Sequence, residues 1–184
     1  SEINNNGWPG YVGHGIYTKG ISGLIRGNKV HNNAGFGIHC WASCYGSSDK
    51  PYIIEQNEAY ENGQISGSEL VVGGTLSEAA PPNDGLPHNV LVRSNMLHDG
   101  KGFGLDYLGS CRETVYGTNV TFSENVVWNN AKAQLLLRNF NRTEIRVENN
   151  SFSSNSSALL VRVINAWLQE NALDGNVYYR DNSS

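Results

Sequence analysis

The stretch FSENVVWNN at residues 122–130 carries the pattern that decides the fold. An apolar residue, Phe122, is followed three positions later by Asn125, then by the apolar Val127 and a second asparagine, Asn130. Other copies of this nine-residue pattern occupy residues 25–33, 54–62, 92–100, 147–155 and 168–176. A partial copy opens the chain, with Ile3 and Asn6 in the matching places. Recurrence of this kind predicts a repeat architecture.

The spacing inside each copy is fixed, whereas the spacing between copies is not. The two asparagines are five residues apart in five of the six full copies, and Gly100 replaces the second asparagine in the other. Successive first asparagines are separated by as few as 21 residues (150 to 171) and by as many as 38 (57 to 95). A constant core segment with connections of variable length is typical of a solenoid. We therefore expect residues 1–184 to form a single solenoid domain, which could be a fragment of a longer one.

Alternating apolar residues predict the strands of each coil. Stretches such as 89–93 (NVLVR) and 119–123 (NVTFS) precede the first asparagine, and shorter apolar runs such as 135–137 (LLL) follow the second. The expected fold class is all-β, a right-handed parallel β-helix of about seven coils stacked about 4.8 Å apart. The first asparagines, from Asn28 to Asn171, should form an internal ladder whose amides bond from coil to coil. The apolar residue before the first asparagine of each copy should form one inward column, and the apolar residue between the two asparagines should form a second. The last copy places Leu168 in the first column and Leu173 in the second.

Composition and charge exclude several classes of function. Only 16% of the 184 residues are charged, and the net charge is −4 with no cluster of cations, which argues against nucleic acid as a partner. No apolar run approaches the ~20 residues needed to cross a bilayer. The three cysteines leave two alternatives open, one disulfide with a spare thiol or three reduced thiols among Cys40, Cys44 and Cys111.

Three segments resemble the parallel β-helix repeat superfamily, the pectate-lyase-like right-handed β-helices. They are HGIY at residues 14–17, GFGI at 35–38 and DGNVYY at 174–179. That superfamily includes pectate and alginate lyases and periplasmic maturation proteins, so the resemblance implies an extracellular or periplasmic protein with a polysaccharide groove. No lyase active-site motif can be carried over. We accordingly expect no cofactor and no metal site, with Ca²⁺ as the one ion left open.

The candidate site lies beside three longer excursions, at residues 40–51, 73–88 and 109–118, which should form the wall of a groove. A lyase acting on a uronate polymer needs a base and a cation that stabilises the enolate. The sequence offers His39 as the base, Lys19 or Arg138 as the cation, and Asp106 about 10 Å from His39, two coils away. Both His39 and Asp106 are expected to point outward. The expected sugar-binding side chains are Tyr17, Trp41 and Tyr107.

Two further outward rows run along the solenoid. One contains the rings of His31, Tyr60, His98 and Trp128, which could bind sugar faces or could stabilise the fold by stacking. The other alternates in sign through Arg26, Glu55 and Arg93, and we expect a structural charge ladder there.

The leading hypothesis is an extracellular carbohydrate-interacting β-helix, similar to polysaccharide lyases. The alternative is a non-catalytic structural, adhesive or assembly module, in which the polar residues of the candidate site are simply solvated. In either case nothing in the sequence resembles a helical cap, so we expect another chain or a missing segment to cover the N-terminal coil.

Overall fold

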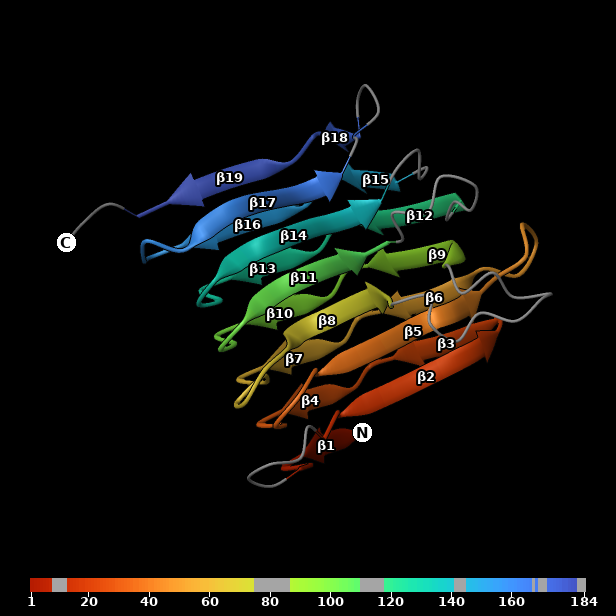
Figure 1. Cartoon of the computed structure of the whole chain (residues 1–184), viewed down its shortest axis with the longest axis horizontal. Helices are drawn as coiled ribbons and strands as arrows, with labels where there is room; N and C mark the ends of the chain where they lie inside the picture. The colour runs from red at the N-terminus through yellow and green to blue at the C-terminus, as the bar shows by residue number, and fades with distance from the viewer. Residues whose placement is uncertain are drawn as a thin grey trace.

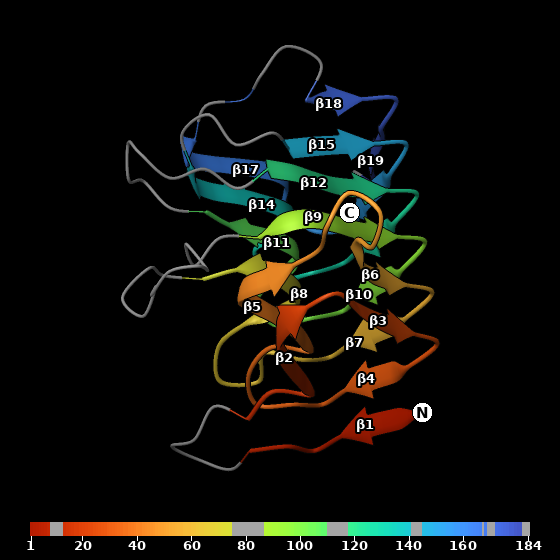
Figure 2. The ribbon, with the colours of Figure 1, turned by 90° about the vertical axis from the view of Figure 1, so that its right-hand side faces the viewer.

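The computed structural model describes residues 1–7, 13–74, 87–109, 118–140, 145–166, 168 and 172–181. In this part of the chain the regular elements are all β-strands, and neighbouring strands pair in parallel. The strands stack from the N-terminal to the C-terminal end as a parallel β-solenoid (Figure 1). The side view shows the same succession, from β1 at one end to β18 at the other (Figure 2).

One strand of each turn lies in a seven-stranded sheet, which we call the first sheet. Its members, in stacking order, are β1 (Glu2–Asn4), β4 (Lys29–His31), β7 (Glu58–Tyr60), β10 (Met96–His98), β13 (Val126–Trp128), β16 (Ser151–Ser154) and β19 (Val177–Arg180).

The other strands form a twelve-stranded sheet with two rows. The long row contains β2 (Ile16–Ile21), β5 (Ile38–Tyr45), β8 (Ser68–Gly73), β11 (Phe103–Leu108), β14 (Ala133–Phe140) and β17 (Leu159–Ala166). The short row contains β3 (Gly23–Arg26), β6 (Tyr52–Glu55), β9 (His88–Arg93), β12 (Thr118–Ser123), β15 (Ile145–Glu148) and β18 (Leu173–Asp174). The two rows meet where Tyr45 of β5 pairs with His88 of β9.

The solenoid comprises about five full turns with shorter, incomplete turns at its two ends. The expected count of about seven coils therefore included the end turns. Apolar side chains fill the interior, and those of the middle coils are completely buried, among them Ile54, Leu97 and Phe122. Their counterparts in the outer coils, such as Ile25 and Val161, are only partly buried against the same core. The covering of the N-terminal coil by another segment stays a prediction.

The asparagine ladder is confirmed in the interior of the solenoid. Asn57 donates from its backbone N and from its side-chain Nδ2 to Oδ1 of Asn95, both at 3.0 Å. The same paired bonds link Asn95 to Asn125 and Asn125 to Asn150. Each side-chain oxygen of this ladder thus accepts from the backbone N–H and from the amide of the preceding coil, which gives these buried turn N–H groups their acceptors.

The last copy of the repeat is out of register with the prediction by five residues. Leu173 pairs with Val147, so it belongs to the first inward column, and Tyr178 pairs with Phe152 in the second. Asn150 accordingly donates to Asn176 at 2.9 Å, at the rung that the sequence pattern assigned to Asn171. Asn171 itself lies outside the described residues. The pattern failed here because two asparagines five residues apart fit either rung.

Candidate functional site

The candidate site is a group of rings on the outer face of the long row, in the first two coils. Ile16 and Ile38 pack in the core, so the residues that follow them, Tyr17 and His39, face outward. Three neighbouring rings complete the group. We call it the aromatic cluster, and its members are His14, Tyr17, Phe36, His39 and Trp41.

The rings of the aromatic cluster contact one another closely. Tyr17 stacks on His14 with ring centroids 5.4 Å apart and lies 6.1 Å from Trp41. The Tyr17 side is the open one, because Tyr17 is 52% exposed and Trp41 is half-buried. A rigid platform of apolar rings with polar edges is suited to the face of a sugar, which is apolar along its C–H bonds and polar at its rim.

His39 occupies the centre of the aromatic cluster and is only 3% exposed. Its ring centroid lies 4.7 Å from that of Phe36 and 5.0 Å from that of Trp41. Nε2 is 3.3 Å from the carbonyl oxygen of Gly73, whereas the buried Nδ1 has no hydrogen-bond partner. Burial lowers the pKa of His39 to about 4, so the imidazole is neutral at neutral pH. His39 faces outward, as expected, but the surrounding rings cover the imidazole, so it is not open to solvent.

A disulfide holds Trp41 in the aromatic cluster. Cys40 and Cys44 are bonded to each other with Cα atoms 5.8 Å apart, and both side chains are completely buried. Thr18 pairs with Cys40 and Gly20 with Cys44, so residues 41–43 of β5 oppose Lys19 alone on β2. The disulfide closes this β-bulge and fixes Trp41 at its start. Of the two cysteine alternatives the structure has the disulfide, and Cys111 lies outside the described residues.

The carboxylate of Asp106 is held in an ion pair with Arg138 and has a structural role. It is completely buried on β11, where Arg138 Nη2 donates to Oδ2 at 2.8 Å, Arg138 Nε donates to Oδ1 at 3.2 Å, and Ser68 Oγ donates to Oδ2 at 2.9 Å. Burial raises the pKa of Asp106 against the opposing effect of Arg138. His39 and Asp106 are two strands apart, as expected, with Val71 between them. Asp106 is on the outer face, as expected, but it is completely buried there and Arg138 is engaged with it.

The remaining sequence candidates are separated from one another. Tyr107 is completely buried, and its ring centroid lies 6.3 Å from that of Phe122 in the core, so its expected role in sugar binding is wrong. Lys19 is exposed on β2. The structure therefore gathers Tyr17, His39 and Trp41 at one place, pairs Asp106 with Arg138 at a second, and leaves Tyr107 inside the solenoid.

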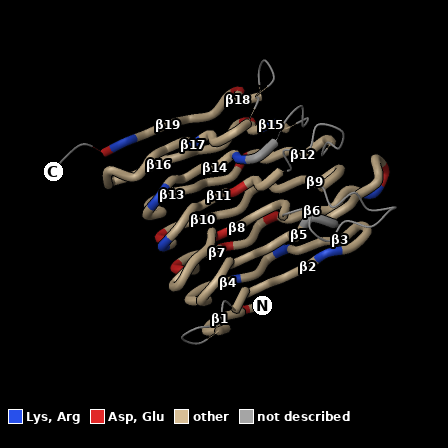
Figure 3. Tube along the Cα trace, viewed as in Figure 1, with Lys and Arg blue, Asp and Glu red and all other residues tan. Residues whose placement is uncertain are grey.

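The ring row on the first sheet stacks on itself. Ring centroids are 4.7 Å apart for His31 and Tyr60, 5.2 Å for Tyr60 and His98, and 4.1 Å for His98 and Trp128. The planes are within 8° of parallel. Each inner ring gives both faces to its neighbours, so only edges remain for a ligand, and the geometry favours the stabilising role. The charge row is also confirmed, because Arg26 and Arg93 both form ion pairs with Glu55. Figure 3 shows the charged positions along the trace.

Sequence reasoning missed a buried acid, Glu69, at the start of β8, whose side chain reaches back to Asn62 in the turn that follows β7. Its side chain accepts hydrogen bonds from the backbone N and from Nδ2 of Asn62. Burial raises its pKa to about 8. Gln134 occupies the corresponding place two coils on and accepts from the backbone N of Asn130 at 2.9 Å. The sequence did carry a signal for this role of Glu69, because the equivalent positions in the neighbouring coils are the glycines Gly37 and Gly104.

Those positions must be glycine because the asparagine of the next coil occupies the space that a side chain would need. A Cβ at Gly37 would lie 2.7 Å from Nδ2 of Asn62, and one at Gly104 would lie 2.6 Å from Nδ2 of Asn130. Glutamate or glutamine appears at this position where the following coil lacks an inward asparagine. Asn155, assigned to that rung by the repeat, is exposed instead.

Two of the three expected excursions lie mostly outside the described residues. The excursions at 73–88 and 109–118 are described only at their edges, so the groove stays a prediction. The excursion at 40–51 is shorter than expected, because β5 continues to Tyr45.

Within the described ranges, no three His, Cys, Asp or Glu side chains come together as a set of metal ligands. The described part also contains no helix of the length and apolarity that a membrane span requires.

One comparison with known proteins gives a match. A family model described as a right-handed β-helix region matches residues 1–180 of this chain. No curated protein and no solved structure matches it.

Proposed function

Because this chain belongs to the right-handed β-helix family, we propose that it is a carbohydrate-binding β-helix protein and that the aromatic cluster is its binding surface. One observation carries the proposal: five rings converge on the outer face of two adjacent coils, with Tyr17 52% exposed at their open side. An exposed tyrosine held by stacked neighbours offers contact area at little cost in conformational entropy.

The proposal assigns no bond-breaking step to this surface. A lyase acting on uronates would need a base that can reach the sugar and a cation beside the developing enolate. Here the other rings enclose the His39 imidazole, and Arg138 already neutralises Asp106. Lys19 is the one exposed cation among the sequence candidates.

We further propose an extracellular or periplasmic location. The disulfide between Cys40 and Cys44 supports it, since such bonds persist in oxidising compartments and are rare in reducing ones. A non-catalytic structural module is the alternative function, and the self-stacked rings of the first sheet are the feature that favours it, because they stabilise the solenoid.

Titration calorimetry with cello-oligosaccharides and oligogalacturonates tests the proposal. We expect binding by the unmodified protein and a loss of at least tenfold in affinity for Tyr17→Ala. Tyr179→Ala is the matched control, because Tyr179 is 60% exposed on β19 and lies outside the aromatic cluster. If neither series binds, or if the two variants behave alike, carbohydrate binding at this surface is wrong. Absorbance of an unsaturated product from oligogalacturonate would instead restore the lyase hypothesis.

A further inference from the structure

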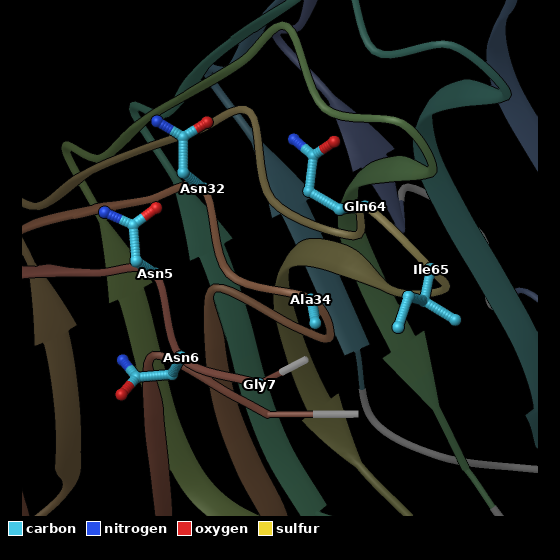
Figure 4. A pocket seen from close by; sticks show the side chains of 7 residues that line it. All are labelled: Asn5, Asn6, Gly7, Asn32, Ala34, Gln64 and Ile65. Carbon is cyan, nitrogen blue, oxygen red and sulfur yellow. The ribbon is translucent and has the colours of Figure 1, made fainter. Parts of the chain in front are cut away.

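A second feature lies at the turn between the first sheet and the long row, in the first coils. It is a cavity of about 380 Å³ among described residues, and Figure 4 shows it from close by. The residues that line it are Asn5, Asn6, Gly7, Asn32, Ala34, Gln64 and Ile65. Its volume is within the ordinary range for sites that bind small molecules.

Three side-chain amides stand on one side of this cavity. In Figure 4 the amides of Asn5, Asn32 and Gln64 rise in the same direction, whereas Asn6 turns the other way. Asn6 Nδ2 donates to Asn33 Oδ1 at 2.9 Å.

The other three amides also use one N–H locally: Asn5 Nδ2 donates to Asn4 Oδ1 at 2.6 Å, Asn32 Nδ2 lies 3.1 Å from His31 Nδ1, and Gln64 Nε2 donates to Glu61 O at 2.5 Å. The amide oxygen and the second N–H of each are the groups that a ligand would use. Asn5 and Asn32 occupy the same turn position in successive coils, both with left-handed backbone (φ 56° and 54°), so their spacing is about 4.8 Å.

The backbone around the cavity is held in place by hydrogen bonds. Gly63 N donates to Gly35 O at 2.8 Å, and Ile65 N donates to Ala34 O at 3.0 Å. These bonds fix the segment that carries Gln64 and Ile65 over the preceding coil. The site is therefore built by the fold.

The chemistry of the lining indicates the ligand. A side-chain amide both donates and accepts hydrogen bonds, as a sugar hydroxyl does, and Ala34 and Ile65 supply apolar contact. The described residues of the lining include no Lys, Arg, Asp or Glu, so none of them would neutralise a uronate carboxylate. The cavity is also close to the aromatic cluster along the chain, because Phe36 follows Ala34 by two residues, and Phe36 N donates to His14 Nδ1 at 3.1 Å.

We infer that this cavity is a second subsite, which binds a neutral sugar unit of a glycan whose other units lie on the aromatic cluster. The inference rests on the proposed function and adds to it the class of ligand, a neutral polymer, and a second point of attachment. A chain long enough to reach both places should bind more tightly than a short one, because the second contact is then intramolecular.

The test is titration calorimetry with cello-oligosaccharides of two to six units, and with oligogalacturonates of the same lengths. For the unmodified protein we expect affinity to rise with cello-oligosaccharide length and to exceed that for oligogalacturonate at equal length. Asn32→Gly and Gln64→Ala should each weaken the longest oligomer about three- to tenfold, the cost of one hydrogen bond, and leave the shortest unchanged. Glycine keeps the left-handed backbone at position 32, and Gln64 is exposed, so both variants should fold.

Asn129→Gly is the control, since Asn129 has the same turn position (φ 53°) three coils beyond Asn32 and does not line the cavity. The subsite is wrong if affinity does not depend on length, if the uronate series binds as well, or if Asn129→Gly matches Asn32→Gly. Those results would leave binding at the aromatic cluster intact. Loss of all lengths in Tyr17→Ala, with length dependence in the unmodified protein, would support both proposals.

Discussion

The carboxylate of Glu69 fills the space that a side chain at Gly100 would need. A Cβ at Gly100 would be 2.2 Å from Oε1 of Glu69. Gly100 is the position at which the repeat lacks its second asparagine, and Glu69 supplies the missing acceptor to Asn62. Two irregularities in the sequence, a missing asparagine and an unexpected buried acid, are thus one compensated feature.

This relationship predicts that Gly100→Asn and Glu69→Gly rescue each other, because Gly37 and Gly104 stand at the position of Glu69 wherever the next coil has its asparagine. Gly100→Asn alone should lower the free energy of unfolding by about 2 kcal/mol through overpacking. Glu69→Gly alone should cost about 2 kcal/mol, because two donors of Asn62 lose their acceptor. The double variant should recover most of the loss, seen as a coupling energy in urea denaturation. Gly27→Asn is the control, since nothing lies within 4 Å of that Cβ position and asparagine is among the residues that best tolerate its left-handed backbone (φ 67°). Additive losses would contradict the pairing.

Glu69 also predicts a pH dependence of stability. Its pKa is raised from 4.5 to about 8 by burial, so the folded state holds the proton more tightly than the unfolded state does. The contribution of Glu69 is therefore complete below pH 4.5, falls as the pH rises towards 8, and stays lost above it. Glu69→Gln removes this dependence, because Gln134 shows that glutamine fits the same role. Denaturation of both proteins from pH 4 to 9 measures the difference, and parallel curves would refute it.

The pair of Asp106 and Arg138 should act on stability alone. Arg138→Ala leaves a buried carboxyl without its cation, and we expect a loss of about 3 kcal/mol in the free energy of unfolding. Asp106→Leu combined with Arg138→Met should restore most of that loss, since the column neighbours Val71 and Leu136 are already apolar. Arg146→Ala, at an exposed position, is the matched control. A specific loss of glycan affinity in the refolded double variant would instead indicate a role in binding.

The disulfide predicts a link between redox state and binding. Replacing both Cys40 and Cys44 by alanine should cost about 2 kcal/mol of stability, the value expected for so short a loop. It should also weaken glycan binding, because the bulge that carries Trp41 gains freedom. Dithiothreitol should reproduce both effects in the unmodified protein and have neither effect in the double variant. Equal responses of the two proteins to the reductant would show that a different disulfide, formed by Cys111 between molecules, is responsible.

The sequence by itself determined the solenoid. Asparagines at a fixed spacing between apolar positions favour an arrangement in which identical residues stack and bond between coils, so the repeat predicts the solenoid even where it leaves the register of a coil open. It also indicated the charge row through Glu55 and the ring row through Tyr60, because residues in equivalent positions of a stacked repeat must be neighbours.

The tertiary structure alone decided which polar residues are buried and which are engaged. Alternation correctly placed His39 and Asp106 on the outer face, but whether an outer face is covered depends on neighbouring side chains that alternation does not describe. The register of the last coil, the acceptor role of Glu69 and the enclosure of His39 all depend on contacts between residues in different coils or on different strands. The sequence carried a signal for the one at Glu69, through Gly37 and Gly104 at the equivalent positions, whereas the others are fixed only by space filling in three dimensions.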